Sequence, residues 1–118
     1  MDKEKVIADF FSWFSNRDLD RLPNLLTEEV SLFFPKAQPI KGRERFLKFL
    51  RILFRQYPQL TFHVQRIIIQ EDQAAVHWCN RGISRGGEPY ENEGVSWFEF
   101  VDGRINFISD FFKDTGKF

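Results

Sequence analysis

The chain has 118 residues and a formal net charge of zero, with 17 Lys and Arg side chains against 17 Asp and Glu. This balance argues against nucleic-acid binding, because phosphate backbones are recognised by concentrated positive charge. The basic residues are dispersed and no apolar run approaches the ~18 residues of a membrane span, so no membrane anchor is expected. The charged start of the chain is unlike a secretory signal, and the single cysteine, Cys79, excludes an internal disulfide. We therefore predict one cytoplasmic domain over residues 1–118.

Aromatic residues are the unusual part of the composition, with 15 Phe and 3 Trp in so short a chain. Most of these rings are needed for the core, because each buries a large apolar area. A half-open sheet with facing helices can also leave rings around a cavity, and aromatic walls suit apolar ligands. The composition is therefore compatible with a binding pocket as well as with a Phe-rich core.

Three helices are predicted in the first half of the chain. Residues 3–16 place apolar side chains at helical spacing. Asp18 or Asp20 can cap a short second helix, and its apolar residues would be Leu22, Leu25 and Leu26. Residues 43–57 give the clearest pattern, with an apolar stripe opposite a row of Arg and Lys.

Strands are predicted in the remainder. A short strand is expected at 30–34, followed by a Pro-bounded loop at 35–41. Beyond Pro58 the apolar period changes to two, which predicts strands at 59–70, 74–84, 88–101 and 104–112. They are separated by residues typical of hairpin turns: Glu71-Asp72, Gly86-Gly87 and Asp102-Gly103. Helices followed by an antiparallel meander indicate an α+β fold.

Three short motifs carry a family resemblance. Residues 16–20 read N-R-D-L-D, residues 39–44 read P-I-K-G-R-E, and residues 98–105 read F-E-F-V-D-G-R-I. In this order and spacing they resemble the SnoaL-like and nuclear transport factor 2-like superfamily. The resemblance implies a cone-shaped, curved antiparallel sheet packed against three N-terminal helices, with one internal apolar pocket. The functions of this superfamily are diverse, so the fold alone does not name a reaction.

Two active sites known in the superfamily match this chain poorly. The tyrosine and two aspartates of ketosteroid isomerases fall at Phe10, at Phe33 or Phe34, and at Ser96, so the ionisable groups are missing. In the limonene-epoxide-hydrolase group, the last aspartate of the Asp-Arg-Asp arrangement falls at Asp110. The arginine and first aspartate fall at His77 and Cys79, and the water-holding residues near Leu32 and Phe34. Neither chemistry is expected by these routes.

SnoaL-type polyketide cyclases match better near the end of the chain. Their acid–base aspartate also falls at Asp110, and the family closes a ring by an intramolecular aldol reaction without a metal or a nucleotide. The resemblance implies proton transfer at Asp110, with no cofactor and no metal site. We also consider His77 as an assisting group that pairs with Asp110. Whether the chain is an enzyme or a non-catalytic, ligand-binding accessory dimer stays open.

The ligand implied by this resemblance is a small apolar or polyketide-like molecule, and a set of mostly aromatic residues is expected to bind it: Phe10, Phe14, Phe34, Tyr90, Ser96 and Phe98. The position of Asp110 depends on strand register, because successive residues of a strand face opposite sides. A two-residue Asp102-Gly103 turn would direct Ser109 inward, whereas a three-residue loop with a bulge at Gly103 would direct Asp110 inward. The resemblance favours the second. In the alternative without a functional role, Asp110 is a surface residue that pairs with Lys113.

The outer face of the sheet is predicted to carry an apolar patch of Val95, Trp97 and Val101, joined by Phe107 and Phe111 if Asp110 faces inward. Exposed patches of this kind often mark interfaces. We therefore expect a homodimer formed through the sheet.

Overall fold

A computed structural model describes the backbone of residues 2–117 and the side chains up to Gly116. The elements in chain order are α1 (Lys3–Ser15), the 3-10 helix η1 (Leu22–Leu25), β1 (Leu26–Phe33), β2 (Ile40–Lys41), α2 (Arg43–Gln56), β3 (Gln59–Gln70), β4 (Gln73–Ile83), β5 (Pro89–Val101), β6 (Arg104–Phe112) and the 3-10 helix η2 (Thr115–Lys117). No described helix is both long and apolar enough to cross a membrane.

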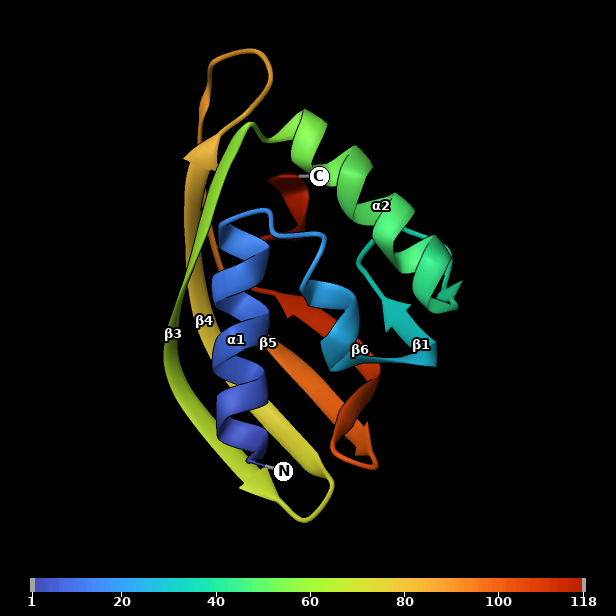
Figure 1. Cartoon of the computed structure of the whole chain (residues 1–118). Coiled ribbons are helices and arrows are strands. Elements are labelled where there is room, and N and C mark those ends of the chain that lie inside the picture. Colours follow the sequence, from blue (N-terminus) through green and yellow to red (C-terminus); the bar gives the residue numbers. More distant parts are fainter. Residues whose placement is uncertain (1, 118) are drawn as a thin grey trace.

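The six strands form one curved sheet in the order β2-β1-β6-β5-β4-β3. Figure 1 shows β3 and β4 curving around α1, which lies against the concave face, while α2 runs beside β1. Strands β3 to β6 form the predicted antiparallel meander. The expectation of a wholly antiparallel sheet is wrong, because β1 pairs with β6 in parallel. Alternation of apolar residues identifies a strand but does not reveal the direction of its partner, so the sequence did not show the mixed sheet.

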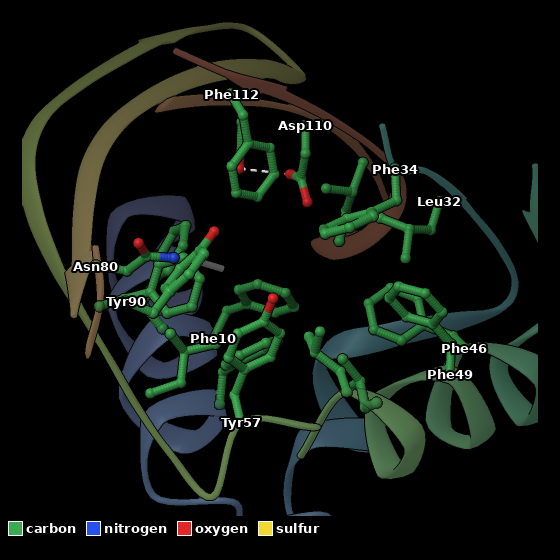
Figure 2. A pocket seen from close by; sticks show the side chains of 18 residues that line it. Phe10, Leu32, Phe34, Phe46, Phe49, Tyr57, Asn80, Tyr90, Asp110 and Phe112 are labelled. Atoms are coloured by element: carbon green, nitrogen blue, oxygen red, sulfur yellow. Dashed lines mark hydrogen bonds between the residues drawn. The ribbon is translucent and has the colours of Figure 1, made fainter. Parts of the chain in front are cut away.

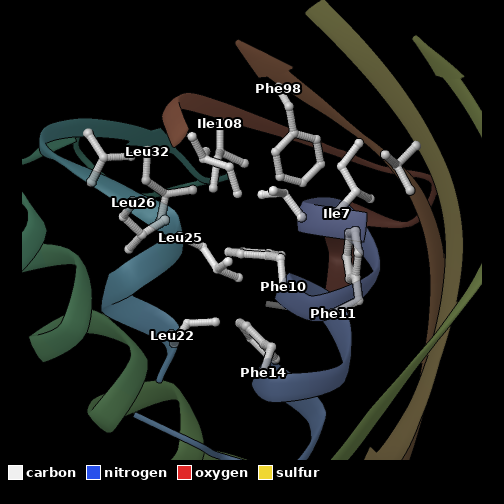
Figure 3. Packing of buried hydrophobic residues seen from close by; sticks show 14 of the residues in the cluster. Ile7, Phe10, Phe11, Phe14, Leu22, Leu25, Leu26, Leu32, Phe98 and Ile108 are labelled. Atoms are coloured by element: carbon white, nitrogen blue, oxygen red, sulfur yellow. The ribbon is translucent and has the colours of Figure 1, made fainter. Parts of the chain in front are cut away.

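Helix α1 forms as predicted and provides one wall of the core. The Asp2 side chain caps it by accepting a hydrogen bond from the backbone N–H of Lys5. Trp13 is half-buried, and the other apolar residues of α1 at helical spacing are buried: Val6, Ile7, Phe10, Phe11 and Phe14. Figure 3 shows the rings of α1 directed into the cluster that contains Phe98 and Ile108 of the sheet.

The predicted second α-helix is absent from the described residues, and a four-residue 3-10 turn, η1, stands in its place. Leu26 already begins β1, earlier than the predicted strand at 30–34. Leu22, Leu25 and Leu26 are all buried, a pattern that a helical turn followed by a strand satisfies as well as a longer helix does. The sheet therefore packs against two α-helices rather than three. The short strand β2, within the predicted loop, was also missed.

The β5–β6 hairpin determines which way Asp110 faces. Asp102 and Gly103 both have positive φ, 52° and 79°, as in a two-residue type I′ turn. Phe100 pairs with Ile105 while Glu99 pairs with Phe107, so Asn106 is an extra residue in a β-bulge. The bulge restores the inward direction of Asp110 that a two-residue turn alone would reverse. It lies at Asn106 rather than at Gly103, and Thr27 Oγ1 donates a hydrogen bond to Asn106 Oδ1 at 2.7 Å.

Candidate functional site

A cavity of about 40 Å³ lies between the concave face of the sheet and the two α-helices. This volume has room for about three water molecules. Its lining is dominated by aromatic rings from α1, α2, the end of β1 and the sheet, as Figure 2 shows. Among the 18 described residues that line it, Asp110 is the one carboxyl group and none carries a cationic side chain. The cavity is therefore a mostly apolar site with a single carboxyl group.

Asp110 extends from β6 into this cavity (Figure 2). Its Oδ1 accepts a hydrogen bond from Ser96 Oγ at 2.6 Å, and its other carboxyl oxygen is directed toward the cavity. The residue keeps some accessible surface, but the carboxyl lies deep in the protein, where water solvates its charge poorly. Burial raises the pKa of Asp110 from 3.8 to about 6, and the Ser96 hydrogen bond lowers it by a smaller amount. Asp110 therefore titrates close to neutrality.

Ser96 is held in place by Trp78. The indole Nε1–H of Trp78 donates to Ser96 Oγ at 2.8 Å, and both side chains are almost fully buried. An indole N–H is a donor only, so Ser96 must use its single hydroxyl proton toward Asp110. The row Trp78–Ser96–Asp110 thus fixes one carboxyl oxygen and leaves the other for a bound molecule.

Most of the predicted pocket residues surround the cavity. Its lining includes Phe10, Phe14, Phe34, Tyr90 and Ser96. Phe98 does not line it, because this residue lies deeper in the core, with its ring 5.5 Å from that of Phe10. Burial raises the pKa of Tyr90, so its phenol is neutral near pH 7.

His77 does not lie in the site. On β4 the neighbouring residue Val76 faces inward, in the same row as Ser96 and Asp110, and His77 projects from the opposite face. There its Nε2 lies 2.6 Å from Glu93 Oε2. The predicted His77–Asp110 pair is therefore wrong, and Cys79 lies on the same outer face. Both positions were obtained by counting residues from the family motif, and each is one residue away from an inward-facing position of β4.

Asn80 is a cavity residue that the sequence reasoning missed. It follows Ala74, Val76 and Trp78 in the inward row of β4, and it is 2% exposed. The alternation of apolar residues along this strand was the available signal, because it puts the even-numbered positions inside. Among the described residues, no group of three or more His, Cys, Asp or Glu side chains is arranged to hold a metal ion.

Comparisons with known proteins give a consistent assignment. The family model described as the SnoaL-like domain matches residues 7–108. An uncharacterized protein of Schizosaccharomyces pombe is 27% identical over 115 residues, which cover 92% of this chain and 84% of that protein.

Many solved structures share the fold, and three of them illustrate the likeness. An NTF2-like protein of unknown function from Burkholderia pseudomallei superimposes with a TM-score of 0.91, at 18% identity and over 99% of this chain and 95% of the other. TerC, co-crystallised with polyporic acid, gives a TM-score of 0.88 at 18% identity and 98% and 93% coverage. A protein from Jannaschia sp. CCS1 assigned to the SnoaL-like polyketide cyclases gives 0.86 at 19% identity and 94% and 85% coverage. At these identities the likeness shows the NTF2-like α+β fold and not the activity.

Proposed function

The chain belongs to the SnoaL-like domain family. We therefore propose that it binds a small, largely apolar, polyketide-like molecule in the Asp110 cavity, takes a proton from this molecule and returns it. Asp110 is the acid–base group in this proposal. The observation that carries it is a single buried carboxyl, with a pKa of about 6, in a cavity lined by aromatic rings.

The raised pKa suits a general base that must also return its proton. At pH 7 about nine in ten Asp110 carboxyls are ionised, so the base form predominates. The conjugate acid is weaker than an ordinary aspartic acid, which makes the carboxylate a stronger base toward a carbon acid. The carboxylate would take a proton from the carbon next to a ligand carbonyl, giving an enolate and a neutral carboxylic acid. That acid would then return the proton to carbon or oxygen.

Two further features support the proposal. The Trp78–Ser96 hydrogen bonds hold one carboxyl oxygen, so the other stays directed at the ligand without reorganisation. The solved structure of TerC with polyporic acid provides an example of this fold co-crystallised with an organic ligand. A ligand larger than a few waters requires the walls to move, and Phe34, Phe49 and Tyr57 lie between the cavity and a groove on the surface of α2.

The test is hydrogen–deuterium exchange at the carbon acid of a probe ketone, 2-tetralone, in D₂O. The wild-type chain should accelerate exchange at least ~100-fold over Asp110→Asn, the lower end of the effect of a positioned acid–base group. Asp102→Asn, in the exposed β5–β6 turn, is the matched control and should retain the wild-type rate. Equal rates for Asp110→Asn and wild type would refute the catalytic role, and a probe that still binds would then indicate a non-catalytic ligand-binding protein.

A further inference from the structure

Asn80 is another polar side chain that lines the cavity, and it has no part in the proposed proton transfer. Asn80 on β4 lies directly opposite Asn92 on β5, on the inner face of the sheet. The two are 2% and 8% exposed, respectively. They are the same residue type in neighbouring positions, yet their hydrogen bonding differs completely.

Asn92 uses its amide to hold the structure together. Its Nδ2 donates to the hydroxyl of Tyr90 and to the carbonyl of Asp114, and its Oδ1 accepts from the backbone N–H groups of Glu93 and Asp114. These contacts tie β5 to the segment after β6. The role of Asn92 is therefore explained within the fold.

Asn80 has no such role. Its Oδ1 is buried and has no hydrogen-bond partner among the described residues. Figure 2 shows the nitrogen of its amide turned toward the cavity. Buried polar groups are almost always paired, because an unpaired one loses its hydrogen bonds to water without replacement. A leucine has nearly the same shape and would avoid this loss. A molecule bound in the cavity explains the amide, because it meets the nitrogen directly and the oxygen after half a turn of the amide.

We propose that Asn80 recognises the ligand of this cavity, and that the ligand is a ring compound with a hydroxyl group at the end remote from Asp110. This inference rests on the proposed function. A hydroxyl fits because it can accept from the amide N–H₂ and, after half a turn of the amide, donate to the amide oxygen. The body of the ligand lies against aromatic rings between the two polar residues.

The register of the sheet sets the length of this ligand. Asn80 faces Asn92, whereas Asp110 faces Ser96, so the two polar residues are four positions apart along β5. At ~3.4 Å per residue this is roughly 14 Å along the strand. Asn80 and Asp110 also lie on the two strands that flank β5, which adds roughly 9.5 Å across the sheet between their backbones. The inward-pointing side chains and the curvature of the sheet shorten the gap that a ligand spans. Two fused rings, with the reacting carbon on one and the hydroxyl on the other, match this arrangement better than one ring does.

The experiment compares two probes, 2-tetralone and 6-hydroxy-2-tetralone, by isothermal titration calorimetry. The wild-type chain should bind the hydroxylated probe about tenfold more tightly, the effect of one hydrogen bond to a buried group. In Asn80→Leu this preference should disappear while 2-tetralone still binds. The melting temperature of Asn80→Leu should equal or exceed that of the wild type, whereas Asn92→Leu, the matched control, should melt at a lower temperature.

The outcomes separate this inference from the proposed function. If wild type and Asn80→Leu bind both probes equally, the cavity binds ligands but Asn80 does not recognise a hydroxyl, and only this inference fails. A lower melting temperature for Asn80→Leu, with an unchanged preference for the hydroxylated probe, would show that Asn80 is a structural residue. This result would also overturn the inference. If neither probe binds the wild-type chain, this inference and the proposed function fail together.

Discussion

At the scale of single residues, Asp110 makes the folded chain less stable as the pH rises. Its pKa is raised to about 6 in the folded state, so the fold favours the protonated form. Below pH 3.8 the carboxyl is protonated in both states and contributes no difference. Between pH 3.8 and about 6 the unfolded chain ionises first and stability falls, and above pH 6 the full loss remains. The loss is at most about 3 kcal/mol.

Replacing Asp110 with Asn should therefore stabilise the chain in a pH-dependent way. Asn has no charge to bury and can still accept the hydrogen bond from Ser96. We expect Asp110→Asn to raise the free energy of unfolding by up to about 3 kcal/mol at pH 7.5 and by little at pH 3.5. Urea denaturation at the two pH values measures the difference. Asp102→Asn, in a turn where Asn tolerates positive φ, should show no such dependence, and an equal gain for Asp110→Asn at both pH values would contradict the buried ionisation.

At the scale of secondary-structure elements, Arg17 links the loop after α1 to the end of α2. Its guanidinium donates hydrogen bonds to the carbonyls of Phe54 and Tyr57 and lies 4.6 Å from the centre of the Phe54 ring. Carbonyls at the end of a helix lack partners within the helix, and a cation there also interacts favourably with the helix dipole. Tyr57 lines the cavity. Arg17 therefore holds one wall of the site as well as the helix end.

Arg17→Met should loosen this wall. We expect a loss of roughly 1.5–3 kcal/mol in the free energy of unfolding, the usual range for hydrogen bonds that involve a charged group. Amide hydrogen exchange at the C-terminal end of α2 should accelerate at the same time. Arg21→Met is the control: Arg21 also lies over an aromatic ring, but its ion pair with Asp18 is local and exposed, so the loss should stay below about 1 kcal/mol. Similar losses for both variants would contradict the capping role.

The elements also show what the sequence could and could not predict. Helical periodicity gave α1 and α2, and alternation gave β3 to β6, because these patterns depend only on neighbours along the chain. The inward direction of Asp110 depends on a bulge at Asn106, whose side chain is bonded by Thr27 of another strand. No local pattern contains that contact. The alternation of apolar residues along β4 could have identified Asn80 as an inward-facing residue. The prediction instead counted residues from the family motifs, which pointed to His77.

At the scale of the whole molecule, the outer face of the sheet carries the predicted apolar residues Val95, Val101, Phe107 and Phe111, and Phe33 joins them. The predicted Trp97 is half-buried there, and its Nε1 donates a hydrogen bond to Glu99 Oε2. Phe111 is 61% exposed, Val101 48%, Val95 38% and Phe33 37%, and the rings of Phe33 and Phe107 are 5.2 Å apart. Strands β1, β6 and β5, which contribute these residues, are neighbours in the sheet, and on β5 Trp97 and Glu99 lie between Val95 and Val101. We propose that a second copy of the chain covers this apolar patch, with the same surface on both subunits about a two-fold axis.

Phe111→Lys should convert such a dimer into a monomer, because two buried ammonium groups would face an apolar partner at the interface. Light scattering at micromolar concentration measures the mass directly. Ile52→Lys provides the matched control, since Ile52 is 45% exposed but lies on α2, away from the patch. Its mass should remain that of the wild type. A monomeric wild-type chain would exclude the dimer.

The monomeric variant should keep the raised pKa of Asp110, because Phe111 projects from the opposite side of β6 to Asp110. Loss of the raised pKa would show that the proton site depends on the partner.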